Sequence, residues 1–405
     1  MRVVTALNLI LRVPGARVVD LAVEGDVLVV KLQPASRSHR CPCGTTTGAR
    51  YDRSRRRWRH LDLATAKVFY EADIARVDCR GCGRVRTEQV PWARPGARHT
   101  ILFEDLVAWL AQRTDKTSIS RLLRCSWEAI QRVVTRVVAE RLDDSRFDGL
   151  RHIGVDEISY KRGHRYLTVV ADHDTGRVVW VAEGRTQQAL QGFFDALGPE
   201  RRSRIEAVSM DMATIYRDAT RRAVPQAAIC FDPFHLVRWA NEAVDSVFKT
   251  VDRRSSELTG RDWRTARYAL RAGGERLGAR HRQLLATIEA DRAELFAAWE
   301  LKEEFRALFQ TVAPDDAAGY LRDWIRRCVH SGLPAMANLA RRVHRNFDGI
   351  VNTVRYGLSN SRLEGINAKI RLINRRGYGH PNWQNLAAMI HLCLGGITVP
   401  LPTRR

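Results

Sequence analysis

The chain has 405 residues, 45% of them apolar, which allows roughly two to four folded units and excludes a chain that is mainly disordered. Its 67 lysines and arginines against 45 acidic residues give a formal net charge of +22. This charge predicts a polyanionic partner, and nucleic acid is favoured over an acidic membrane surface because the planar fork of arginine suits phosphate. No stretch approaches the ~18 uninterrupted apolar residues of a membrane helix. Residues 3–11 are too short for a secretory signal, so we expect a cytoplasmic, nucleoid-associated protein with no membrane partner.

A small β domain is predicted at the start of the chain. Residues 17–23 and 27–32 alternate apolar and polar side chains as two strands. An arginine run follows, in which Arg55, Arg56 and Arg57 stand directly before a tryptophan. Such a run contacts DNA phosphates or is simply a solvated face, and the sequence leaves both interpretations open.

Two close cysteine pairs flank this run. The pairs are Cys41 with Cys43 and Cys79 with Cys82, and 35 residues separate them. Cysteines of a cytoplasmic protein are expected as thiols or metal ligands, and paired thiolates with glycines in their turns predict a structural Zn²⁺ site. Four protein ligands would leave no open position for catalysis. The alternative is two unrelated pairs of free thiols, and the single residue inside the first pair, where two are usual, is the departure from the pattern.

Three helices are predicted next, over 101–112, over 118–123 and from Trp127 onward, the last capped by Ser126. One side of the third helix is apolar: Trp127, Ile130, Val133, Val134, Val137 and Val138. The other side is polar and partly basic: Glu128, Gln131, Arg132, Thr135 and Arg136. A short helix, a tight turn and a helix with such an outer face are typical of a helix-turn-helix, although any small helical bundle is the alternative.

A mixed sheet covered by helices is predicted for the middle of the chain. Its strands are expected over 152–158, 166–171, 178–182, 205–210 and 226–231. Helices follow the third strand, over 186–197, and the fourth. Residues 233–347 are almost wholly helical, and the last helices are predicted over 361–374 and 383–394.

Three acidic residues stand out in this second half. Asp156 and Asp211 each end an apolar strand, and Glu364 opens a helix. A strand-end aspartate commonly caps a following helix and a helix-borne glutamate is commonly solvated, so each residue alone also has a purely structural explanation. Other carboxylates compete for a catalytic role: Glu157 on the other strand face, and Asp172 and Asp174 in a turn. Spacing alone does not choose among them.

The helix that carries Glu364 presents a polar stripe beside an apolar face at 100° per residue. The stripe contains Asn360, Glu364, Asn367 and Arg371. The apolar face contains Leu363, Ile366, Ile370 and Ile373. Two strand-end aspartates and one such glutamate are able to hold two Mg²⁺ ions about 4 Å apart for an in-line phosphoryl transfer.

The chain resembles the DDE-type transposases of bacterial insertion sequences, most closely the ISL-three family, from the cysteine pairs to Gly379. The segments that carry the resemblance are Gly154-Val155-Asp156-Glu157, Met210-Asp211-Met212, Phe231-Asp232-Pro233-Phe234-His235, Ser359-Asn360-Ser361-Arg362-Leu363-Glu364-Gly365-Ile366-Asn367 and Arg375-Arg376-Gly377-Tyr378-Gly379.

The resemblance implies a multidomain α+β and α/β protein. Its expected parts are an N-terminal zinc-binding β domain (1–92), a helix-turn-helix domain (97–148), a ribonuclease-H-like mixed-sheet core (149–238), an all-α insertion (239–350), and a C-terminal part of the core that carries the catalytic glutamate (351–405).

The resemblance also implies the roles of individual residues. Asp156, Asp211 and Glu364 are expected to bind catalytic Mg²⁺ or Mn²⁺, and His235 of an Asp-x-x-His segment is expected beside the second aspartate or the scissile phosphate. Supporting positions are Asp232, His235, Asn360, Asn367 and Arg371. Expected DNA contacts are Arg55, Arg56, Arg57, Gln131, Arg132, Thr135, Arg136, Arg375 and Arg376.

The implied reaction is metal-dependent cleavage of double-stranded DNA at the terminal inverted repeats of a mobile element, followed by strand transfer to target DNA. Because two ends must be held together, a homodimer or higher assembly on DNA is expected. Two other interpretations remain: a catalytically silent DNA-binding regulator derived from a transposase, and a DNA nuclease without strand transfer.

Overall fold

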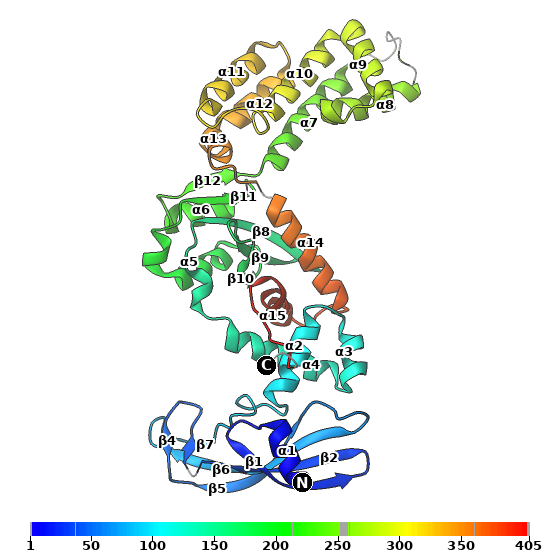
Figure 1. The fold of residues 1–405 in the computed structure, drawn as a ribbon. Coiled ribbons are helices and arrows are strands. Elements are labelled where there is room, and N and C mark those ends of the chain that lie inside the picture. The colour runs from blue at the N-terminus through cyan, green and yellow to red at the C-terminus, as the bar shows by residue number, and fades with distance from the viewer. Residues whose placement is uncertain are drawn as a thin grey trace. The chain divides into compact units, whose positions relative to one another are not determined.

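The computed structural model describes residues 2–36, 38–212, 214–251, 258, 260–359 and 361–402 (Figure 1). The chain divides into two compact units, the first made of residues 1–143 and 375–405 and the second of residues 144–374. The boundary falls inside helix α14 (Ser361–Arg376). No helix in the described ranges is long and apolar enough to cross a bilayer.

A five-stranded sheet forms the N-terminal part of the first unit, with strand order β1-β2-β6-β5 and β7 paired to β6. The strands are β1 (Ala16–Glu24), β2 (Val27–Pro34), β5 (Asp52–Arg59), β6 (Lys67–Cys79) and β7 (Arg84–Thr87), and β3 (His39–Arg40) pairs with β4 (Thr46–Thr47) separately. The predicted hairpin is confirmed, since β1 and β2 are antiparallel. The core of this sheet contains Trp58 and Trp92, which pack edge to face with ring centroids 5.7 Å apart.

Helix α1 (Val3–Leu11) packs on β1, and Asn8 joins the two elements. The Asn8 side chain accepts a hydrogen bond from the Val18 amide at 2.8 Å and donates one to the Val18 carbonyl at 2.9 Å. This residue, which interrupts an otherwise apolar N-terminal segment, therefore satisfies backbone groups of the neighbouring strand.

The three helices predicted for the helix-turn-helix are confirmed as α2 (Ile101–Ala111), α3 (Lys116–Leu123) and α4 (Trp127–Arg141). Each begins at a side-chain cap. Thr100, Asp115 and Ser126 accept a hydrogen bond from the backbone amide three residues later. The caps define where each helix starts, and the turn between α3 and α4 follows from the left-handed backbone of Arg124 (φ 49°).

Helix α15 (Trp383–Leu394) packs on α4 in the first unit. Its C-terminal end is tied to α2, because the Gln112 side chain donates to the carbonyls of Leu392 at 2.7 Å and Ile397 at 3.0 Å. The sequence groups residues 351–405 with the central sheet, whereas in the structure residues 375–402 pack with the helix-turn-helix. The apolar periodicity of α15 shows that the helix is buried but does not identify the partner that buries it.

A buried ionic cluster joins the linker before α2 to the helices. Arg94 is 4% exposed, and its guanidinium contacts Asp105 at 2.7 Å, Glu104 at 3.2 Å and Glu140 at 2.6 Å. Glu104 is fully buried and also contacts Arg136 at 2.9 Å. Buried carboxylates need such partners, so Arg94 keeps two charges of α2 compensated.

The second unit contains the predicted mixed sheet, with strand order β10-β9-β8-β11-β12 (Figure 1). The strands are β8 (His152–Lys161), β9 (Arg165–Asp172), β10 (Val178–Glu183), β11 (Ala207–Met210) and β12 (Ala228–Phe231). The first three are antiparallel, whereas β11 lies parallel to both β8 and β12. Helices α5 (Gln187–Arg202) and α6 (Thr214–Ala223) bury Phe193, Phe194 and Tyr216 against the sheet, and a short 3₁₀ helix, Asp144–Phe147, precedes it.

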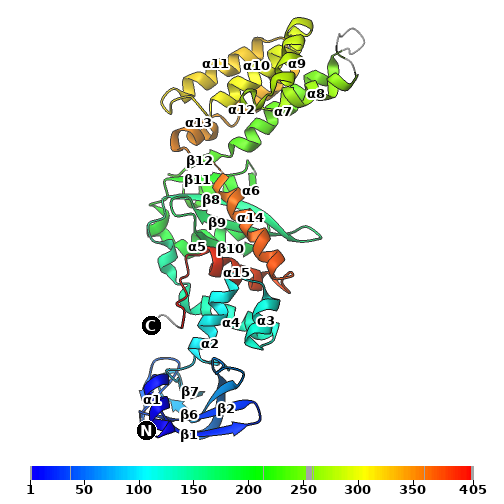
Figure 2. The ribbon, with the colours of Figure 1, turned by 45° about the vertical axis from the view of Figure 1, so that its right-hand side comes forward.

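The predicted helical segment is confirmed as a layered array in the same unit (Figure 2). Its helices are α7 (Pro233–Thr250), α8 (Gly260–Arg271), α9 (Ala279–Asp291), α10 (Ala293–Ala307), α11 (Ala317–His330), α12 (Pro334–His344) and α13 (Phe347–Tyr356), with a 3₁₀ turn at Gly274–Arg276. Trp324 and Phe305 stack in its core. The array returns to the sheet through α13, where the Thr353 hydroxyl accepts from the Phe231 amide and donates to the Phe231 carbonyl of β12.

Replacement of Arg94 by alanine is expected to destabilise the first unit. The change leaves Glu104 and Asp105 buried with fewer cationic partners, and breaking a buried pair costs about 3–5 kcal/mol. The lower end of that range applies, because Arg136 still contacts Glu104. Urea unfolding followed by circular dichroism measures the loss, and Arg121→Ala, an exposed substitution on α3, is the matched control. Equal stability of the two variants would contradict the assignment.

Candidate functional site

Asp156 and Asp211 come from two adjacent strands in the interior of the central sheet. β8 and β11 are parallel and pair in register, with Val155 opposite Met210. The next residue of β8 is Asp156, and Asp211 directly follows β11, so both carboxylates leave adjacent strands at the same level. Asp211 directly follows its strand, as predicted. The prediction that Asp156 ends a strand is wrong, because β8 continues to Lys161 as the first half of a hairpin with β9. The parallel pairing of β8 and β11, which are distant in the chain, brings the two aspartates together.

The two carboxylates interact electrostatically. Burial raises the pKa of Asp156, and the negative charge of Asp211 raises it further. Two hydrogen bonds oppose this shift: Asp156 Oδ1 accepts from the Glu157 amide at 2.8 Å, and Oδ2 accepts from the Asn367 side chain at 2.7 Å. A half-buried carboxylate beside a second one is an arrangement that a bound cation would stabilise.

His235 lies against the same pair. Helix α7 begins at Pro233 directly after β12, so His235 stands in its first turn. Its Nδ1 lies 3.0 Å from Asp232 Oδ2 and 3.6 Å from Asp211 Oδ1. The hydrogen bond with Asp232 raises the pKa of His235, and the charge of Asp211 adds to this effect.

Helix α14 runs along β8 and contacts it at several levels. Leu363 lies at Gly154, Asn367 bonds to Asp156, and the Asn374 side chain donates to the Tyr160 carbonyl at 3.0 Å. A Cβ atom at position 154 would lie 2.5 Å from the Leu363 side chain, closer than any real contact. The glycine of the Gly-Val-Asp-Glu segment is therefore required for this helix to approach the strand.

Glu364 lies on α14 one turn before Asn367 and is exposed. Within the described residues it does not join Asp156 and Asp211 in a group whose ligand atoms are close enough to share one ion. Asn360 lies outside the described residues, and Arg371 is exposed on α14. The structure thus places His235 in contact with Asp211 and places Asp156 on the neighbouring strand, while Glu364 stands on the helix that contacts Asp156 through Asn367.

The competing carboxylates have other partners. Glu157 lies on the opposite strand face, as predicted, and pairs with Arg185 at 2.9 Å, although burial still raises its pKa. Asp172 is engaged in its turn, where it accepts hydrogen bonds from the amides of Asp174 and Thr175. The turn assignment of Asp172 is therefore confirmed.

One contact in this region has no sequence signal. His173 Nε2 lies 2.6 Å from the hydroxyl of Ser209 on β11, and the His173 carbonyl accepts a hydrogen bond from Arg362 of α14. This histidine thus joins the turn after β9 to both elements that carry the candidate site. No local pattern identifies it, since its partners are 36 and 189 residues away.

The four cysteines converge as predicted. Their sulfur atoms all lie within 4.8 Å of one another, with Cys41 to Cys82 at 3.8 Å and Cys43 to Cys79 at 3.5 Å. Tetrahedral Zn²⁺ with Zn–S bonds of about 2.3 Å places its sulfurs about 3.8 Å apart, so this donor set fits zinc. The Thr45 side chain contacts Cys43 at 3.3 Å and lowers the pKa of that thiol to about 6.

Gly81 permits the close approach of the two cysteine loops. A Cβ atom there would lie 2.2 Å from the Thr45 hydroxyl. Gly44 and Gly83 have positive φ values of 96° and 64°, which lets each loop turn back immediately after its second cysteine. The shortened first pair is thus accommodated by backbone geometry that only glycine adopts readily.

The arginine run lies on β5, where successive side chains alternate between the two sheet faces. Arg57 pairs with Glu24 at 2.8 Å and with Glu71 at 2.6 Å, and these hydrogen bonds raise its pKa. Arg55 contacts Asp73 at 3.3 Å. A DNA phosphate at this face would have to compete with carboxylates of the chain itself.

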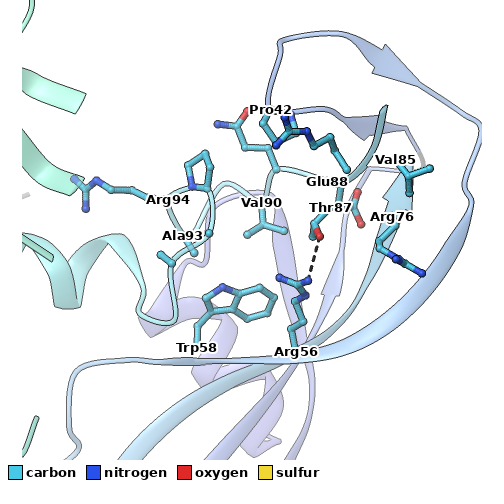
Figure 3. A pocket seen from close by; sticks show the side chains of 15 residues that line it. Pro42, Arg56, Trp58, Arg76, Val85, Thr87, Glu88, Val90, Ala93 and Arg94 are labelled. Atoms are coloured by element: carbon cyan, nitrogen blue, oxygen red, sulfur yellow. Dashed lines mark hydrogen bonds between the residues drawn. The ribbon is translucent and has the colours of Figure 1, made fainter. Parts of the chain in front are cut away.

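Arg56 lies on the opposite face, beside the core residue Trp58. Figure 3 shows its guanidinium directed at the Thr87 hydroxyl, to which it donates at 3.1 Å. It lines a pocket of about 490 Å³ together with Arg76 and Arg86. The alternation of the strand therefore divides the run, and it does not form a single basic patch.

Two predictions for the outer face of α4 need correction. Gln131 is buried, and its side chain donates to the Asn385 carbonyl at 3.4 Å, because α15 covers that side of the helix. Arg136 is half-buried by its ion pair with Glu104. Arg132 and Thr135 are exposed, as predicted.

The expected apolar position of Trp127 also differs. This side chain is 39% exposed and stacks on Tyr378, with ring centroids 5.6 Å apart and planes 21° from parallel. Arg375 is exposed nearby in the chain, whereas Arg376 donates to the Thr114 carbonyl at 2.9 Å. The first turn of a helix often lies outside the packed face, since no preceding turn covers it.

Comparison with known proteins agrees with this organisation. A family model described as a transposase, of the ISL3 DDE type, matches residues 153–390, and the helix-turn-helix domain of transposase family ISL3 matches residues 88–138. A transposase for insertion sequence element IS1557 of Mycobacterium tuberculosis is 38% identical over 95% of this chain and 92% of its own length. A transposase for element IS1001 of Bordetella parapertussis is 27% identical over 88% of this chain and 89% of its own length.

Asp156→Asn is expected to raise the melting temperature of the metal-free protein. The raised pKa of Asp156 means that its ionised form costs stability in the folded state, and this cost appears as the pH rises through that pKa. Asparagine removes the charge. The two proteins should therefore melt alike at pH 3 and diverge toward neutral pH in thermal scans with chelator. A lower melting temperature for Asp156→Asn than for the wild type at neutral pH would show that the ionised carboxylate does not destabilise the folded protein.

Removal of the cysteine cluster is expected to abolish zinc binding. In the double variant Cys79→Ser and Cys82→Ser two of the four thiolates are lost, and elemental mass spectrometry of the purified protein should find no zinc. Cys230→Ala, at a buried thiol of the second unit, is the matched control and should retain it. Equal zinc content in the two variants would exclude the cluster as the metal site.

Proposed function

The chain belongs to the ISL3 family of DNA transposases, and from this membership we propose that Asp156, Asp211 and Glu364 form its catalytic metal site. Its helix-turn-helix domain binds DNA, and the enzyme cleaves and transfers DNA strands. The residue assignment rests on one observation: two aspartates come from adjacent parallel strands. The pKa of Asp156 is raised by burial, and its carboxylate accepts a hydrogen bond from Asn367, which lies on the same helix as Glu364.

The proposed core is ribonuclease-H-like. It comprises residues 149–238 and helix α14, and residues 239–350 form an all-α insertion between them. The strand order, with three antiparallel strands followed by two parallel ones, supports this assignment. We likewise assign residues 1–92 to a zinc-binding domain and residues 97–148 to the helix-turn-helix domain.

The proposed site residues have two roles: the aspartates bind the metal ion, and the residues around them orient the aspartates. Asp156 and Asp211 would hold Mg²⁺ or Mn²⁺, which supplies an activated attacking oxygen and stabilises the leaving one. Asn367 fixes the rotamer of Asp156 through its hydrogen bond. His235, held by Asp232, stands 3.6 Å from Asp211 and is positioned to orient that carboxylate or to contact the scissile phosphate.

Glu364 reaches the site from α14. It is exposed, and α14 contacts β8 through Leu363 and Asn367, which stand on either side of it in the chain. We propose that bound divalent metal brings this carboxylate to the two aspartates, since the cation neutralises the repulsion among three carboxylates. Arg371 would contact DNA along the same stripe.

Recognition of the element ends is assigned to the first unit. Arg132, Thr135 and Arg375 are exposed and remain candidates for contacts with the terminal inverted repeats. Arg55, Arg56 and Arg57 are candidates only where phosphate displaces their present partners. Because two element ends must be joined to one target, we propose a homodimer or higher assembly on DNA.

Asp156→Asn, Asp211→Asn and Glu364→Gln are each expected to reduce strand cleavage to background while binding of the element end is retained. The neutral side chains keep their shape but bind Mg²⁺ poorly. Denaturing gels report cleavage of a labelled element end, and mobility shift reports binding. Asp174→Asn and Glu157→Gln are matched controls. Loss of cleavage in Glu157→Gln but not in Glu364→Gln would assign the third carboxylate to Glu157.

Strand transfer separates a transposase from a nuclease. Incubation of the wild-type protein with Mg²⁺, a pre-cleaved element end and a supercoiled plasmid should give covalently joined products. Cleavage without joining would favour the nuclease interpretation. Binding without cleavage in Mg²⁺ and in Mn²⁺ would favour a silent regulator.

A further inference from the structure

The helical array of the second unit contains a groove lined by basic and aromatic side chains. A groove of about 1080 Å³ opens between the start of α7, helix α8 and the end of α10. The side chains that matter for its chemistry are Phe234, Asn241, Arg264, Tyr268 and Arg271. None of these five residues belongs to the proposed metal-binding, supporting or DNA-contact positions.

The groove presents two aromatic rings to solvent. Phe234 is 61% exposed and Tyr268 is 62% exposed, which is unusual for large apolar side chains. Each ring contacts the ring of one histidine. The Phe234 ring meets His235 with centroids 5.7 Å apart at 82°, and the Tyr268 ring meets His281 at 5.3 Å. Each ring therefore has one histidine neighbour and still exposes most of its surface.

The charged walls are of two kinds. Arg267 is held by Asp245 through two hydrogen bonds, and Arg306 is held by Glu275, so these two guanidiniums stiffen the walls. Arg264 and Arg271, in contrast, are exposed and form no ion pair within the described ranges. They leave positive charge in the groove for an anionic ligand.

An acceptor is also available in the groove. Asn241 Oδ1 is buried and has no hydrogen-bond partner among the residues that the structure describes. An orphaned buried acceptor is costly, and a donor group of a ligand would satisfy it. Amino groups of nucleobases are such donors.

The groove is lined by chain neighbours of the candidate catalytic residues. Phe234 in its wall is the chain neighbour of His235, whose Nδ1 lies 3.6 Å from Asp211. Ser359 and Ser361 also line it, and the latter is the first residue of α14. A strand held in the groove would thus lead directly to the carboxylates.

We propose that this groove binds an unpaired DNA strand beside the scissile phosphate, with bases stacked on Phe234 and Tyr268 and phosphates held by Arg264 and Arg271. The proposal rests on the proposed transposase function. Unpaired rather than duplex DNA is required because only an unstacked base exposes its face to an aromatic ring. The two free arginines match the phosphate charge, which excludes an apolar peptide as the occupant.

The test measures binding of a fluorescein-labelled oligothymidylate of about 12 nucleotides to the full-length protein, by anisotropy in EDTA at low salt. Because the leucine side chains offer no ring for a base to stack on, the double variant Phe234→Leu and Tyr268→Leu should lose at least about tenfold in affinity. The matched double variant Phe234→Tyr and Tyr268→Phe keeps both rings and should bind like the wild type. Blunt duplex DNA should bind all three proteins equally.

The arginine arm uses the same probe. Arg271→Ala should weaken oligothymidylate binding and reduce its salt dependence, while Arg282→Ala, exposed on α9 outside the groove, should not. Wild-type affinity in the leucine double variant, or an equal loss for duplex DNA, would overturn the proposal. Repetition in the Asp156→Asn background separates the two hypotheses, because strand binding without metal does not depend on which carboxylates cleave.

Discussion

The contact between α14 and β8 is the constraint on which the candidate site depends. Gly154 leaves no side chain at the point of contact, and Leu363 fills that space. Two residues further along the same strand face, Asp156 receives its hydrogen bond from Asn367. A strand and a helix that are 211 residues apart at Asp156 and Asn367 thus meet at the level of the proposed catalytic carboxylate. The glycine, the apolar face and the polar stripe of the motif are parts of one packing arrangement.

This packing arrangement brings two carboxylates that repel each other into the candidate site. Parallel pairing of β8 with β11 brings Asp211 beside Asp156, and burial and repulsion raise the pKa of Asp156. Only part of this cost is offset by Asn367 and by His235, whose own pKa is raised through Asp232 and Asp211. We expect such repulsion at a cation-binding site, because carboxylates whose charges were already compensated by the protein would bind a metal ion weakly.

Basic residues in this protein differ in whether their charge is available. Arg57 and Arg94 are tied to carboxylates of the chain, so they stabilise the fold, whereas Arg264 and Arg271 remain without ion pairs within the described ranges. Net charge therefore predicts a polyanionic partner without identifying the surface that binds it. Alternation on β5 and coverage of α4 by α15 decide which of the predicted DNA contacts are exposed.

The sequence by itself determined most of the elements, the cysteine cluster and the position of Asp211 after its strand, because caps, periodicity and ligand spacing are local properties. It did not determine that β8 continues past Asp156 into a hairpin with β9. It also indicated the family through short motifs around Asp156, Asp211 and Glu364. Only the tertiary structure decided that Gln131 is buried under α15, that Trp127 stacks on Tyr378, and that Asn367 rather than a solvent molecule bonds to Asp156. These outcomes depend on which distant segments pack together, and a periodic pattern specifies that a face is buried without specifying its partner.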